Sequence, residues 1–235
     1  MINQLGFVHI IESPSAKDLL EECTEGRSLS EFLKLAGIPH SYNLVTDLET
    51  LDIALYKRLP RVFEEYDLPP ILHLSLHGDR KGIGLTDGSF LSWHELREVL
   101  RDLNNQMEDG LLLCMSSCYG SYGYQLARDD SEDKPFLALV GNSNKISWKD
   151  SAVAYITFYH LLFKNISMEE CVERMISASN DNNFKLWWGH EVKAVLVERM
   201  RNNKLHKEQI LQRLRTLGQE ASQRTASRLG SSRRQ

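Results

Sequence analysis

The sequence predicts an α/β fold with a mostly parallel central sheet and helices on both faces. Short apolar runs of strand length alternate along the chain with longer segments whose apolar residues recur at helical spacing. Two of the runs, residues 71–76 and 111–116, are bounded by turn residues and are typical of strands buried in a parallel sheet. The alternation itself favours crossover connections, which join parallel strands through helices.

Length and composition are those of one globular domain of ordinary to large size. The chain has 235 residues, 42% of them hydrophobic and 26% charged, and a net charge of -4. A chain of this length can bury a full core, and its net charge gives no reason to expect a nucleic-acid site. The apolar stretch 152–163 is much shorter than the roughly 20 residues of a membrane span, so we expect no span.

The first residues and the cysteines indicate the cellular compartment of the protein. Residues 1–11 have no basic stretch before their apolar run and no small-residue cleavage site, so we interpret them as the first strand rather than a signal peptide. Four cysteines without an export signal favour a reducing compartment, and we expect a cytoplasmic protein. On one extended strand, Cys114 and Cys118 would lie about 13 Å apart, too far for a disulfide.

The first third of the chain shows the alternation most clearly. Asp47, followed three residues later by Thr50, is typical of a helix start, and Pro60 predicts a kink or a break in the helix that follows. The predicted elements are extended at 7–12, helical at 15–37, extended at 42–45, helical at 48–66 and extended at 71–76.

The middle of the chain adds a hairpin, a capped helix and further strands. The Asp87-Gly88 turn predicts a small hairpin within 79–92, and Ser92 with Glu95 fits a capping box that opens a helix. Beyond these we expect a strand that ends at Cys118, a strand over 136–141, helices over 151–163 and 167–178, and a last strand over 184–188.

The composition changes near the end, where eight Lys and Arg stand against two Glu from Lys204 onward. We therefore expect a main domain over 1–203 and a basic helical tail over 204–235. Apolar residues recur at helical spacing over 205–217, whereas the last dozen or so residues lack the apolar content to pack and are predicted to be disordered. A basic tail can also bind an acidic partner, although a solvated terminus is the favoured interpretation.

Two reactive side chains follow the two buried runs, His77 before Gly78 and Cys118 before Tyr119 and Gly120. Chemistry in open α/β sheets collects outside the carboxyl ends of the strands. A thiol needs a nearby base to become a nucleophile, and the carbonyl it attacks needs backbone donors for the oxyanion. Either residue alone would be structural, but together they predict a catalytic pair, with the amides of Gly78 and Cys118 as oxyanion donors.

Other chemistry is disfavoured by spacing. His73 shares a strand face with His77, and we interpret it as a core residue. A zinc site made from His73, His77, Cys114 and Cys118 would need distances along the strands that one tetrahedral ion cannot span. The glycines after Cys118 lack the lysine and the spacing of a phosphate-binding loop. We therefore expect no metal and no cofactor.

These blocks together resemble the caspase-like cysteine peptidases, most closely the CHAT branch shared with separase. The resemblance rests on the His77-Gly78 block, the hairpin and helix after it, the block 116–120, and the run from Val140 through Asp150 to Leu162. It covers roughly residues 7–178, and the caspase signature is matched in its Cys-x-Gly part. The resemblance implies a caspase-haemoglobinase fold, a three-layer sandwich, with His77 transferring protons and Cys118 attacking a peptide carbonyl.

The resemblance also implies where a substrate side chain would bind. Metacaspases hold a basic side chain with an Asp two places before the nucleophile, and that place is taken here by Ser116, which has no carboxylate. In separase-like members an Asp after the next strand contacts the basic residue before the cut, and Asp150 holds the similar position. We therefore expect Ser116 and Asp150 to lie in the substrate-binding region, with cleavage after Arg or Lys. The alternative for Asp150 is a helix-capping role.

By the same resemblance, the expected activity is limited proteolysis of one protein substrate. Such peptidases in prokaryotes often serve in defence systems, including systems that release gasdermins, and some await an activating protein partner. The alternative is a caspase-like scaffold or binding module without turnover. The sequence leaves open the identity of the substrate and the oligomeric state.

Overall fold

The computed structural model describes residues 5–106, 110–127 and 136–195, with isolated positions at 198, 208, 209 and 212. The chain divides into two compact units, Met1–Lys193 and Ala194–Gln235. The first unit carries the fold. The predicted basic tail, 204–235, lies outside the described residues apart from the isolated positions.

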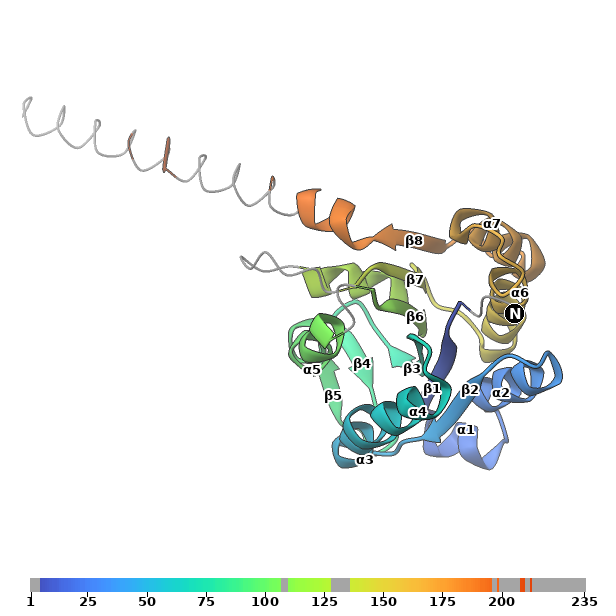
Figure 1. Ribbon diagram of the computed structural model, residues 1–235. Helices are drawn as coiled ribbons and strands as arrows, with labels where there is room; N and C mark the ends of the chain where they lie inside the picture. The colour runs from blue at the N-terminus through green and yellow to red at the C-terminus, as the bar shows by residue number, and fades with distance from the viewer. Residues whose placement is uncertain are drawn as a thin grey trace, which may run out of the picture. The chain divides into compact units, whose positions relative to one another are not determined.

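A mostly parallel sheet lies at the centre of the first unit (Figure 1). Its main strand order is β2-β1-β3-β6-β7-β8, in which β8 is antiparallel to β7 and the other neighbours are parallel. This confirms the predicted α/β class and the predicted last strand. The strands are β1 (Phe7–Ser13), β2 (His40–Leu44), β3 (Pro70–Gly78), β6 (Leu112–Ser116), β7 (Ala138–Asn142) and β8 (Phe184–Trp188).

Helices cover both faces of this sheet and create two hydrophobic cores. One face packs against α2 (Glu25–Leu35), α6 (Trp148–Leu162) and α7 (Met168–Ser179), with Leu29, Tyr155 and Met175 fully buried. The other face packs against α3 (Leu48–Ile53), the π-helical η1 (Ala54–Arg58), α4 (Leu59–Tyr66), α5 (Trp93–Gln106) and the 3₁₀ segment η2 (Gly120–Ala127). The helices and the sheet thus form three layers.

The predicted hairpin is present beside the carboxyl end of β3. Its strands β4 (Gly82–Gly84) and β5 (Phe90–Ser92) are antiparallel, and β4 pairs with His77 and Gly78. Gly88 in the turn has a φ of 91°, which a side chain rarely tolerates. The hairpin therefore places its turns and the start of α5 next to the end of β3.

Two predicted helices differ in detail from the structure. The segment 15–37 forms two helices, α1 (Ala16–Leu20) and α2, because the chain turns at Glu22, whose φ is 57°. The expected disturbance at Pro60 is the π-helical η1 just before it, where the amide of Leu59 donates to the carbonyl of Ala54. Proline has no amide hydrogen, so the helix before it must rearrange its hydrogen bonds.

Two buried histidines serve the core. His73 is fully buried, with Nδ1 3.1 Å from the hydroxyl of Tyr159 and Nε2 3.4 Å from a carboxylate oxygen of Glu25. This placement agrees with the core role expected for it.

Within the described ranges, no helix is long and apolar enough to cross a membrane.

His9 on β1 is also fully buried, and its ring is held on both sides. Nε2 lies 3.1 Å from the carbonyl oxygen of Ala54, to which it donates, and Nδ1 lies 2.7 Å from the hydroxyl of Ser41. Burial lowers the pKa of His9 to about 4; the bond to Ala54 opposes the change and the charge of Arg58 adds to it. His9 therefore stays neutral in the folded protein at mildly acid pH.

This buried imidazole predicts a specific loss of stability in acid. Between pH 6.5 and about 4, the unfolded chain binds a proton at His9 that the folded protein does not bind, so the free energy of unfolding falls as the pH decreases. The slope attributable to His9 reaches about 1.4 kcal/mol per pH unit. Urea unfolding across this range should show a shallower slope for His9→Gln than for wild type, and an equal slope for the two proteins would contradict the buried neutral state of His9.

Candidate active site

The predicted pair lies at the carboxyl ends of two neighbouring parallel strands. β3 pairs with β6 in a register that sets Ser75 opposite Ser116, and His77 and Cys118 each follow two residues later. A Cβ built on Gly78 would lie 2.6 Å from the carbonyl oxygen of Cys118. Only a glycine allows the two strand ends to approach this closely.

One loop contacts both side chains. It connects β7 to α6, and the thiol of Cys118 lies 3.6 Å from the carbonyl oxygen of Ile146 in this loop. Trp148, the first residue of α6, presents its ring to His77 with the centroids 5.2 Å apart and the planes at 72°. The sulfur thus contacts the backbone of Ile146, and the imidazole contacts the side chain of Trp148 two residues later.

Asp18 on α1 is a third member of the site that the sequence analysis missed. Its Oδ2 lies 2.8 Å from Nε2 of His77 and accepts hydrogen bonds from the hydroxyl and the amide of Ser15. Burial alone would raise the pKa of Asp18, but the hydrogen bonds from Ser15 and His77 outweigh it and the pKa is lowered. Asp18 is therefore ionised near neutral pH.

An ionised Asp18 fixes the tautomer of His77. Nε2 faces both Oδ2 of Asp18, at 2.8 Å, and the amide of Ser15, at 3.2 Å. The shorter contact requires hydrogen on Nε2, because a carboxylate can only accept a hydrogen bond, and the amide of Ser15 then donates to Oδ2 of Asp18 instead. Nδ1 is then the nitrogen with a free lone pair, and it is the atom that can take a proton from a neighbouring group. Asp18 thus orients the ring and stabilises it when it becomes charged.

The backbone after Cys118 turns sharply and leaves one donor unused. Tyr119 has a φ of 57°, and its amide donates to the carbonyl of Asn144 at 2.8 Å. Among the residues that the structure describes, the amide of Cys118 donates to no protein acceptor. An unpaired amide next to a thiol is the arrangement that an oxyanion requires.

The two expected substrate-binding residues are placed differently. Ser116 is 1% exposed and its Oγ lies 2.7 Å from Oγ of Ser151, so its hydroxyl is engaged beneath α6. Asp150 is half-buried in the first turn of α6, where one oxygen accepts from the hydroxyl of Ser147 at 2.5 Å. Ser147 is the N-cap of α6 and accepts from the amide of Asp150, so Asp150 contacts the capping residue and is not itself the cap.

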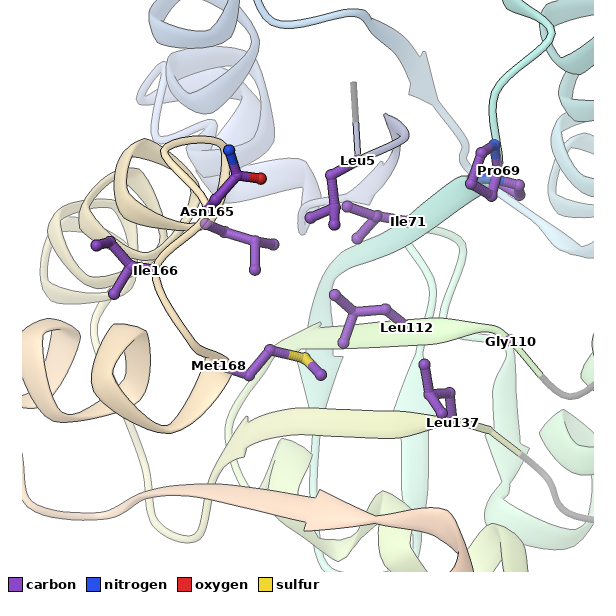
Figure 2. Close-up of a pocket in the computed structure, with 11 residues that line it drawn as sticks. Leu5, Pro69, Ile71, Gly110, Leu112, Leu137, Asn165, Ile166 and Met168 are labelled. Atoms are coloured by element: carbon purple, nitrogen blue, oxygen red, sulfur yellow. The ribbon is translucent and has the colours of Figure 1, made fainter. Parts of the chain in front are cut away.

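An apolar cavity of about 340 Å³ lies at the opposite edge of the sheet (Figure 2). Ile71 and Leu112, near the amino ends of β3 and β6, line it together with Met168 at the start of α7. Neither His77 nor Cys118 lines it, since both follow the carboxyl ends of these strands. In the described part of the chain, no cluster of His, Cys, Asp and Glu could hold a metal ion.

The sequence matches no family model. No curated protein is significantly similar to it.

The contact between Asp18 and His77 predicts a tautomer that can be measured. In wild type, nitrogen-15 NMR of the histidine rings should show His77 with its hydrogen on Nε2, because Asp18 accepts from that atom. Asp18→Ala should leave both tautomers populated. Glu95→Ala is the matched control, since Glu95 accepts from the hydroxyl and amide of Ser92 in the same way but does not contact His77. Equal tautomer populations in wild type would contradict the assignment.

Proposed function

We propose that this protein is a cysteine endopeptidase in which His77 and Cys118 form the catalytic pair. The observation that carries the proposal is the convergence of β3 and β6, which brings Gly78 against Cys118 and sets both reactive side chains against residues 146–148. The three-layer α/β architecture is compatible with the caspase-like fold that the sequence resemblance implies. Asp18 adds an orienting carboxylate to the pair.

The chemistry follows from these groups. Nδ1 of His77 accepts the thiol proton, and the thiolate of Cys118 attacks the carbonyl carbon of a peptide bond. The amides of Gly78 and Cys118 stabilise the oxyanion, and protonated His77 gives its proton to the leaving amine. Water, deprotonated by His77, then hydrolyses the thioester and releases the thiol. Asp18 stabilises the charged imidazole during both halves of the reaction.

The proposed substrate preference rests on the family resemblance and on the carboxylate of Asp150. We propose limited proteolysis of a protein substrate, after Arg or Lys, with Asp150 close to the basic side chain. Ser116 contributes nothing directly, because its hydroxyl is buried and bonded to Ser151. A prokaryotic defence system, in which a gasdermin is the substrate and a protein partner activates the peptidase, is the setting that the resemblance suggests.

A catalytically silent scaffold is the second candidate, and one observation favours it. In the described part of the chain, the thiol of Cys118 is hydrogen-bonded to the carbonyl of Ile146 and not to His77. Catalytic hydrogen bonds are often long or misaligned before the substrate binds, so this geometry also fits a resting enzyme. The two candidates differ in the reactivity that they predict for the thiol.

Labelling with iodoacetamide separates the two candidates, because the four cysteines are free and differ in exposure. Cys23 is exposed, Cys118 is half-buried, and Cys114 and Cys171 are buried. If His77 activates the thiol, Cys118 should be alkylated roughly tenfold faster than the more exposed Cys23, and His77→Ala should remove that advantage. Mass spectrometry of tryptic peptides measures each rate. Alkylation of Cys118 no faster than Cys23 would favour the scaffold.

Turnover is tested with the proteins encoded by neighbouring genes as substrates. Wild type should cleave one of them at a single site after Arg or Lys, and Cys118→Ala should abolish cleavage while unfolding at the same urea concentration as wild type. A small change at a half-buried position costs little stability, so lost cleavage would report the chemistry. Cleavage retained by Cys118→Ala would rule out the mechanism.

A further inference from the structure

A second cavity, of about 350 Å³, lies on the other face of the sheet from α6, at the turn that follows His77 and Gly78. Its walls are the turn between β3 and β4, the first turns of α5 and the end of η2. Three cations line it: Arg80, Lys81 and Arg97. Nothing in the proposed reaction uses these charges.

The turn that carries two of the cations is held in place by hydrogen bonds. The carbonyl oxygen of Arg80 accepts from the indole of Trp93 at 3.0 Å and from the side-chain amide of Gln125 at 3.1 Å. The carboxylate of Asp79 accepts from the amides of Lys81 and Gly82 at 2.6 and 3.1 Å. The backbone is thus fixed from three sides, which lowers the entropy lost when a ligand binds.

The side chains themselves are available for an anion. Arg80 lies over the rings of Tyr119 and Tyr122, with its Cζ 5.3 and 5.8 Å from their centroids. In the ranges that the structure describes, no carboxylate pairs with Arg80 or Lys81, and both are exposed. Tyr119 directly follows Cys118, so Arg80 connects the cationic cavity to the residue after the thiol.

The cavity and Asp150 lie on opposite faces of the sheet, which suggests the direction in which a bound peptide would run. Asp150 lies on α6, which packs on one face of the sheet, whereas the cavity lies at α5, which packs on the other. An extended peptide that crosses the sheet edge at Cys118 advances about 3.3 Å per residue. If its basic residue before the cut binds near Asp150, the residues just after the cut would continue toward the opposite face, where Arg80 and Lys81 line the cavity.

We propose that this cavity binds an anionic side chain of the substrate polypeptide, within the first few residues after the scissile bond. This inference rests on the proposed peptidase function and extends it to a second specificity site. The anion is a carboxylate or a phosphate ester, since a guanidinium and an ammonium bind both. The substrate then carries a basic residue before the cut and an acidic or phosphorylated residue after it.

A peptide series tests the preference with the full chain. Internally quenched peptides carry Arg before the cut and Glu, phosphoserine, Gln or Lys at each of the next four positions. At one position Glu or phosphoserine should raise kcat/KM about fivefold over Gln, and Lys should lower it. The two anions distinguish a carboxylate site from a phosphate site. Lys81→Glu should reverse the order, and Lys57→Glu should preserve it, because Lys57 is exposed on η1 and does not line the cavity.

A binding measurement keeps the inference testable apart from turnover. Fluorescein-labelled hexaglutamate is titrated into the Cys118→Ala protein and followed by anisotropy. Adding Lys81→Glu should weaken binding about fivefold, while adding Lys57→Glu should not. Weakened binding without any peptide cleavage would support the anion site and count against the peptidase. Two results together would overturn the anion site: peptide cleavage at a rate independent of the charge after the cut, and equal hexaglutamate binding by the Lys81→Glu and Lys57→Glu proteins. The proposed peptidase function would remain supported.

Discussion

The close approach of β3 and β6 is the constraint on which the site depends. Neighbouring parallel strands end at the same edge, but a shared edge alone leaves side chains several ångströms apart. Gly78 closes that distance, because its missing side chain makes room for the carbonyl of Cys118. The φ of 57° at Tyr119 then turns the chain back into η2, so that the thiol stays at the edge. A side chain at 78 would push the two strand ends apart.

Buried polar groups also lie near the carboxyl edge of the sheet, at Glu12 and Ser75. Glu12, at the end of β1, accepts from the amides of Gly26 and Arg27 and from the hydroxyl of Tyr42, and burial still raises its pKa. In the described residues, the buried Oγ of Ser75 has no hydrogen-bond partner. Proteins depart from the rule of satisfied burial mainly at functional sites, where the cost is offset elsewhere. The unpartnered hydroxyl of Ser75 is therefore consistent with the site proposed at this edge.

The sequence revealed the parts of the site that follow from periodicity. His77 and Cys118 could be placed because each follows an apolar run, and parallel strands align their ends. Asp18 could not be placed, since its spacing from Ser15 is that of an ordinary capping box and recurs at Ser92 and Glu95. Its contact with His77 joins residues 59 positions apart, and no local pattern encodes such a distance. The contact between Trp148 and His77 could not be predicted either, because these residues are also far apart in the sequence.

The loop that borders both reactive groups owes its position to the last strand. The amide of Ser143 donates to the carbonyl of Asn183, and the side chain of Asn142 donates to Asp181, both just before β8. β8 is antiparallel and is held to the sheet only through β7 in the strand order. Because the carbonyl of Ile146 lies beside the thiol, a shift of β8 would move the group that holds Cys118 at rest. The edge strand β8 thus helps to set the geometry of the candidate site, although it carries neither His77 nor Cys118.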